Sequence, residues 1–137
     1  MKVREIMVRP AIVVKENSTL EEIAQIMLDN RIGCVPVVDK GGKIVGIITN
    51  SEFAAKERAF PFSTFFAPQL FGKWMSKEEI KKIYTAACTM TAKEVMSTSV
   101  ITVTEEEALE EVVKKMLHYD INHVPVVRDR VPVGIVA

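Results

Sequence analysis

The 137-residue sequence lacks the features that mark a secreted, membrane-spanning or nucleic-acid-binding protein. Its two cysteines, Cys34 and Cys88, form no CxxC pair and no disulfide framework. Lysine plus arginine and aspartate plus glutamate number 18 each, so no net positive charge would attract nucleic acid. Apolar runs such as residues 35–38 are far too short to cross a bilayer, and the first residues do not form a signal peptide. These absences predict a cytoplasmic protein that binds neither nucleic acid nor membranes.

Catalytic motifs are absent as well. The two histidines, His118 and His123, have no neighbouring serine, cysteine or carboxylate in a pattern typical of nucleophilic catalysis. The six glycines form no phosphate-binding loop. Hydrophobic residues make up 48% of the chain and charged residues 26%, an ordinary globular balance. We therefore expect a folded protein that is not an enzyme, with no required cofactor and no metal site.

What the sequence does contain is an internal repeat. Shifting the chain by 89 positions, the difference between Met96 and Met7, brings its two ends into register. The longest matches pair Glu5-Ile6-Met7 with Glu94-Val95-Met96, Leu20-Glu21-Glu22 with Leu109-Glu110-Glu111, and Val35-Pro36-Val37-Val38 with Val124-Pro125-Val126-Val127. After a one-residue deletion, Val45-Gly46-Ile47 meets Val133-Gly134-Ile135. The chain is therefore a duplicated unit with an insertion between the copies.

Each unit reads as strand, helix, strand, strand. Apolar residues from Leu20 to Leu28 recur at helical spacing, and Ser18 or Thr19 can cap that helix. In the second copy, Thr104 with Glu107 forms the expected capping box. Gly33 and Asn122 mark the helix exits, because both residue types tolerate a left-handed backbone.

The remaining elements of the first unit follow the helix. Residues 34–38 and 44–49 read as a hairpin of two strands. Pro36 removes a ladder donor, which places the first of these strands at an edge or gives it an irregular start. Residues 50–58 read as a second helix. The insertion holds Phe60, Phe62, Phe65, Phe66, Phe71 and Trp74, and residues 76–87 read as a helix.

These motifs resemble the CBS domain. The resemblance rests on the order βαββα, on Ile6-Met7 and Val95-Met96, on the Pro-Val-Val strand and on Thr-x-x-acid at Thr49 and Glu52. It implies an α/β (α+β) fold of two pseudo-symmetric repeats packed sheet against sheet. The expected boundaries are residues 1–58 for repeat one, 59–90 for a helical, aromatic-rich insertion, and 91–137 for repeat two.

The resemblance also implies a site for an adenosine-containing nucleotide such as AMP, ADP, ATP or S-adenosylmethionine. By the pattern of the family, Thr49 of this chain would contact phosphate or ribose. Glu52 would accept hydrogen bonds from the ribose hydroxyls. The same two residues also fit a simple capping box. The adenine would lie on residues of the first two strands of each copy, namely Ile12, Val13, Cys34, Val35, Ile101, Thr102, His123 and Val124.

The two copies are expected to bind unequally. Ala137 stands where Thr49 stands in copy one, so copy two has no Thr-x-x-acid and no closing helix. Copy two would then offer only a shelf made by Ile101, His123 and Val124. Two functions remain open: a regulatory module that senses a nucleotide and acts on a protein partner, or a structural dimerisation module without a small ligand. Both readings include a homodimer.

Overall fold

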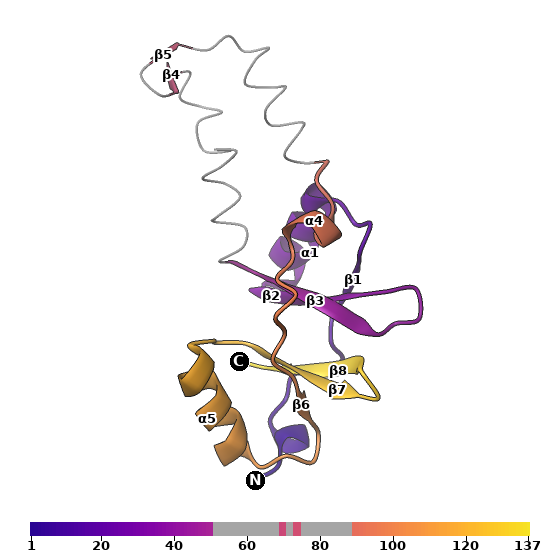
Figure 1. Cartoon of the computed structure of the whole chain (residues 1–137), viewed down its shortest axis with the longest axis vertical. Helices are drawn as coiled ribbons and strands as arrows, with labels where there is room; N and C mark the ends of the chain where they lie inside the picture. The colour runs from indigo at the N-terminus through magenta and orange to yellow at the C-terminus, as the bar shows by residue number, and fades with distance from the viewer. Residues whose placement is uncertain (51–68, 71–72, 75–88) are drawn as a thin grey trace.

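The computed structural model describes residues 1–50, 69–70, 73–74 and 89–137 (Figure 1). Two mixed three-stranded sheets form its centre, and in each the first strand is parallel to the second and the second antiparallel to the third. The first sheet consists of β1 (Val14–Lys15), β2 (Cys34–Val38) and β3 (Ile44–Thr49). The second consists of β6 (Val103–Thr104), β7 (Val124–Arg128) and β8 (Val131–Val136).

The two sheets lie one above the other, and helices cover their outer faces (Figure 1). The first sheet carries α1 (Leu20–Asn30) and α4 (Ala92–Val95), and the second carries α5 (Leu109–Tyr119) and the 3-10 helix η1 (Val3–Glu5). This arrangement confirms the expected α/β fold of two related units.

Helix α1 follows the predicted pattern at its start but not at its end. The Thr19 hydroxyl accepts a hydrogen bond from the Glu22 N–H at 3.2 Å, while Ser18 instead accepts one from Lys15 and closes the turn after β1. Arg31 ends the helix in the left-handed conformation at φ 53°, and Asp120 ends α5 at the same φ. The prediction that Gly33 and Asn122 mark the helix exits was therefore wrong by two residues.

Helix α5 begins without the predicted capping box. Its N-cap is Ala108, which makes no side-chain cap. Glu107 instead accepts a hydrogen bond from the Thr104 N–H at 2.7 Å and closes the turn after β6, as Ser18 does after β1. Burial raises the pKa of Glu107, but hydrogen bonds from Lys115 and Thr104 outweigh it and leave that pKa below the usual value.

Pro36 lies in the central strand of its sheet, not at an edge, and it pairs with Ile47. The backbone N–H and C=O of Ile47 both bond to Ser97 on the other side and therefore point away from Pro36. A residue at position 36 would donate no hydrogen bond to β3. Its nitrogen faces β1, where the ladder begins one residue later at Val37. The missing donor therefore costs no ladder bond. The same geometry holds for Pro125, Ile135 and Val8 in the second sheet.

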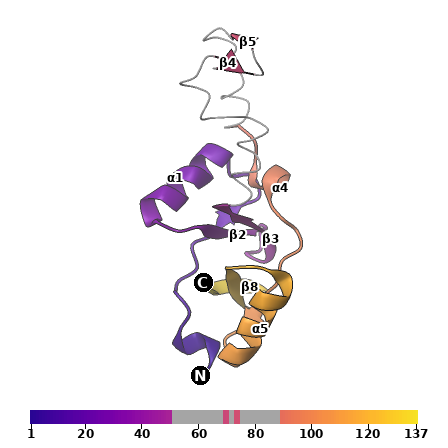
Figure 2. The ribbon, with the colours of Figure 1, turned by 90° about the vertical axis from the view of Figure 1, so that its left-hand side faces the viewer.

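Each sheet is completed by the segment that precedes the other sheet. Val3 belongs to the core on the outer face of the second sheet. Ala92 and Val95 belong to the core on the outer face of the first. Equivalent backbone bonds fix both segments: Val3 N–H to Glu107 at 3.0 Å, and Ala92 N–H to Ser18 at 2.8 Å. Figure 2 shows the N-terminal segment running down to η1 beside α5. The segments that pack together around one sheet are therefore not the same segments that form one sequence repeat.

Apolar burial, more than charge, holds the N-terminal segment in place. Val3 is fully buried, which contributes about 1.5–3 kcal/mol. Lys2 and Arg4 pair with Glu106 at 2.8 and 2.9 Å, and the hydrogen bond from Lys2 lowers the pKa of that carboxyl. All three side chains are about half exposed, so water and salt weaken these pairs.

In two places a segment of one repeat pairs with the third strand of the other repeat. In each place, a methionine of that segment lies over a glycine of the strand. A Cβ on Gly46 would stand 2.7 Å from Cγ of Met96 and closer still to its sulfur. A Cβ on Gly134 would stand 2.8 Å from the sulfur of Met7 and 3.0 Å from the Val8 carbonyl oxygen. Both glycines permit this close approach because they have no side chain.

The part of the insertion that the structure describes is not helical, although a helical insertion was predicted. It contains two short antiparallel strands, β4 (Gln69–Leu70) and β5 (Lys73–Trp74). The predicted helix over residues 76–87 and nearly all of the one over 50–58 lie outside the described residues, as do all of the insertion phenylalanines.

The contacts between methionine and glycine can be tested at Gly46. We expect Gly46→Ala to lower the free energy of unfolding by about 1–3 kcal/mol, because the added methyl group overpacks the contact with Met96. Gly41→Ala is the matched control, since its Cβ would meet only Asp39 Oδ1, at 3.4 Å. Urea unfolding measures both variants. In a Met96→Ala background the cost of Gly46→Ala should largely disappear, and an unchanged cost would contradict the contact.

Candidate functional site

Two cavities lie where the repeats meet. Cleft A has a volume of about 380 Å³ and cleft B of about 230 Å³, and His123 borders both. Cleft A is lined by Ile47, Thr49, Asn50, Ser97, Ser99, Ile101, Asp120, Ile121, Asn122 and His123. Cleft B is lined by Val8, Pro10, Ile12, Arg31, Ile32, Gly33, Cys34, His123, Ile135 and Ala137.

The clefts are related by the sequence repeat, and each takes residues from both copies. In cleft A, Ile47 of the first copy meets Ile101 and Ile121 of the second. In cleft B, the equivalent Ile135 of the second copy meets Ile12 and Ile32 of the first. Each cleft therefore has three isoleucines at matching positions, an apolar surface suited to a flat ring.

Comparison with known protein families agrees with this architecture. A model described as "CBS domain" matches residues 3–56 and 92–137. The chain belongs to the CBS domain family. It carries two CBS domains in tandem, the arrangement called a Bateman module.

Solved CBS structures resemble the whole chain. The CBS domain of a CBS domain containing membrane protein from Sphaerobacter thermophilus is 35% identical, with a TM-score of 0.80 over 100% of this chain and 83% of that one. The CBS domain pair of protein MJ0100, in complex with 5′-methylthioadenosine and S-adenosyl-L-methionine, is 32% identical. Its TM-score is 0.74 over 100% of this chain and 89% of that one.

A curated relative places the CBS pair inside a larger enzyme. L-aspartate semialdehyde sulfurtransferase of Methanocaldococcus jannaschii is 33% identical over 135 residues, which cover 98% of this chain. The chain spans only 21% of the length of that relative. The similarity therefore concerns the CBS pair.

The residues expected at the site divide into three groups. Thr49, Ile101 and His123 line cleft A, whereas Ile12, Cys34 and again His123 line cleft B. The side chains of Val35 and Val124 are fully buried in the two cores and line neither cleft, so only their backbones remain candidates for contact. Val13 and Thr102 do not line the clefts, and Glu52 lies outside the described residues.

The structure also regroups these residues. The sequence interpretation kept Ile101 and His123 with the second cleft, beside Ala137. Ile101 lies instead with Thr49, His123 borders both clefts, and Ala137 lies with Ile12 and Cys34. The grouping was wrong because each repeat contributes a segment to the other. The residues that follow Met96 pair with β3 and therefore lie at the end of the first sheet.

Sequence reasoning missed several polar residues of cleft A. Ser97 and Ser99 follow Met96 in the segment that pairs with β3. Asp120 and Asn122 lie between α5 and β7. None belongs to a motif that recurs in both copies, which is why the repeat did not reveal them. The available signal was their position beside the repeated Met96 and beside His123, which aligns with Cys34.

His123 is the titratable ring at the boundary of the clefts. Burial lowers the pKa of its imidazole below the usual 6.5, so the ring is uncharged at neutral pH. Its Nε2 lies 3.5 Å from the position of a Cβ on Gly33, and Asn50 Nδ2 lies 2.8 Å from the same point. A neutral imidazole offers one donor and one acceptor to a ligand in either cleft.

Among the described residues, no three histidine, cysteine, aspartate or glutamate side chains gather closely enough to hold a metal ion. None of the helices described there has both the length and the apolar composition needed to cross a membrane.

Proposed function

We propose that this CBS pair is a regulatory module that binds an adenosine-containing ligand in the clefts between its repeats. The observation that carries the proposal is the pair of matching isoleucine sets at the two clefts. The complex of the MJ0100 pair with 5′-methylthioadenosine and S-adenosyl-L-methionine supports it, because that pair is 32% identical to this chain.

The geometry of cleft A suits a nucleoside. An adenine ring would lie against Ile47, Ile101 and Ile121, which form the apolar surface. Thr49 and the neighbouring amides and hydroxyls would bond to ribose, with Glu52 as the expected second acceptor.

A ligand in either cleft would act on the arrangement of the repeats. It contacts residues of both copies, so it binds best to one relative position of the two sheets. Binding shifts the population toward that position, and a protein partner can respond to the shift. This mechanism needs no catalytic residue, and we propose that the module itself is not an enzyme.

Ligand binding can be measured through thermal stability and calorimetry. We expect AMP, ADP, ATP or S-adenosylmethionine at about 100 times Kd to stabilise the fold by about 2.7 kcal/mol and raise its Tm. Thr49→Val should weaken the ligand bound in cleft A about tenfold, because one hydrogen bond of about 1.4 kcal/mol is lost. Thr102→Val is the control outside the clefts. Equal affinities for both variants would remove Thr49 from the site.

A second candidate function is dimerisation, as the sequence suggested. Leu28 on α1 and Leu117 on α5 occupy equivalent positions and are 73% and 79% exposed. Large apolar side chains at repeated positions on two outer helices favour a contact between two copies of the chain.

Sedimentation tests the dimer directly. We expect the wild-type chain to sediment as a dimer at micromolar concentration and the double variant Leu28→Glu/Leu117→Glu to sediment as a monomer, because the new charges cannot be buried without partners. Val131→Glu, a similar change at an exposed valine away from both helices, should leave the dimer intact. A wild-type monomer, or a double variant that remains dimeric, would contradict this contact.

A further inference from the structure

The two clefts share their isoleucines and differ almost everywhere else. At the other matched positions where both clefts have a lining residue, cleft A carries a polar side chain or an acid. Cleft B carries a non-polar residue or cysteine at all but one of these positions. Four of the replaced pairs are Thr49 and Ala137, Ser97 and Val8, Ser99 and Pro10, and Asn122 and Gly33. The apolar surface is thus common to both clefts, and the surrounding chemistry is not.

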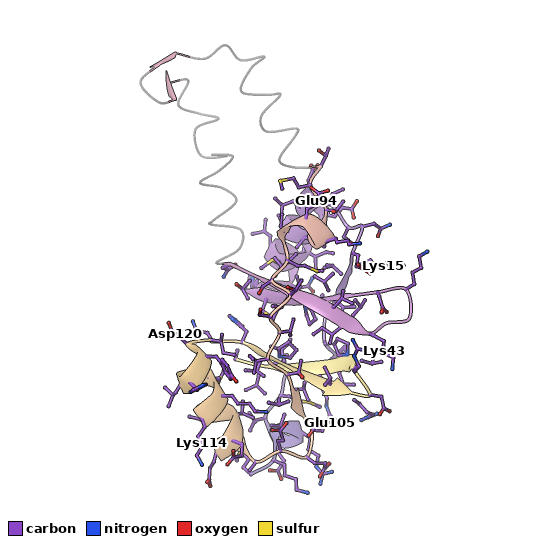
Figure 3. All side chains as sticks on the ribbon, viewed as in Figure 1. Lys15, Lys43, Glu94, Glu105, Lys114 and Asp120 are labelled. Carbon is purple, nitrogen blue, oxygen red and sulfur yellow. The ribbon has the colours of Figure 1, made fainter. Side chains whose placement is uncertain are left out.

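The exceptional position carries opposite charges in the two clefts. Asp120 lines cleft A and Arg31 lines cleft B, and the shift of 89 residues aligns them. Each is the residue that ends its helix, with φ 53° and ψ 52° for Asp120 and φ 53° and ψ 46° for Arg31. The two charges therefore occupy the same place in the two repeats. Figure 3 shows Asp120 at the end of α5 nearer to the other repeat.

Helix capping does not explain Asp120. The C-terminal end of a helix carries partial negative charge, which favours arginine at this position and disfavours aspartate. The left-handed conformation is one that asparagine or glycine would adopt at lower cost. Neither Asp120 nor Arg31 makes a side-chain hydrogen bond or ion pair with another residue that the structure describes. Both charges are therefore available to a ligand.

We propose that the two clefts separate adenosine ligands by charge. Cleft B takes a nucleoside phosphate, whose phosphate pairs with the Arg31 guanidinium. Cleft A takes an adenosine derivative without phosphate, whose cationic or hydroxyl substituent meets the Asp120 carboxylate. The larger volume of cleft A, about 380 against 230 Å³, suits a longer substituent. This assignment rests on the proposed function and names the ligand class for each cleft.

Reciprocal charge exchange provides the test. Arg31→Asp and Asp120→Arg each introduce a residue type that the other repeat already carries at φ 53°, so the backbone accepts both. Calorimetry on the full chain uses AMP as the anionic probe and S-adenosylmethionine as the cationic one. Lys40→Asp, in the hairpin turn outside both clefts, is the control for net charge.

The expected results are opposite for the two variants. Arg31→Asp weakens AMP at least about tenfold and leaves S-adenosylmethionine unchanged, because only one cleft loses its partner charge. Asp120→Arg weakens S-adenosylmethionine by a similar factor and adds a second AMP site. Lys40→Asp changes neither ligand. Arg31→Asn and Asp120→Asn give smaller losses of the same ligands, because they remove the attraction without adding repulsion, and asparagine tolerates the left-handed backbone.

The failures of the two proposals are distinguishable. If both ligands bind the wild-type chain and Arg31→Asp leaves AMP unchanged, or weakens both ligands equally at an unchanged Tm, charge separation is wrong and adenosine binding stands. If none of AMP, ADP, ATP and S-adenosylmethionine binds the folded wild-type chain, the proposed function fails and charge separation fails with it.

Discussion

The structure depends on two equivalent backbone pairings at the outer edges of its sheets. Ile47 exchanges both hydrogen bonds with Ser97 at 3.0 and 2.9 Å, and Val8 exchanges both with Ile135 at 2.8 and 3.0 Å. Each pairing attaches the segment that leads into one repeat to the third strand of the other. The methionine before each pairing then covers a glycine of that strand, so no side chain larger than hydrogen fits there.

These pairings explain several features that would otherwise be unrelated. They occupy the outer side of Ile47 and Ile135, which allows Pro36 and Pro125 to lie in central strands. They also bring Ser97 beside Thr49 and Val8 beside Ala137, where the clefts form. A cleft of this protein is consequently a product of the exchange between repeats, and neither repeat alone could make one.

The sequence predicted the repeated strands and helices because their signals are local. The apolar spacing from Leu20 to Met27 and the Pro-Val-Val strands reappear in the structure with small changes at their ends. It did not predict the helix exits, because arginine rarely adopts the φ of 53° that Arg31 has, and the glycine and asparagine two residues further on carried the stronger signal. It also misgrouped Ile101, because strand exchange leaves no periodic pattern in a chain and depends on contacts between distant residues.

The central claim is that each ligand contacts both repeats at once. Isoleucine methyl NMR tests it most directly, because the six isoleucines of the two clefts act as separate probes. During titration with an adenosine ligand, we expect Ile47, Ile101 and Ile121 to shift as one set, or Ile135, Ile12 and Ile32 as the other. A set drawn from one repeat, such as Ile12, Ile32 and Ile47 shifting without the others, would contradict the account.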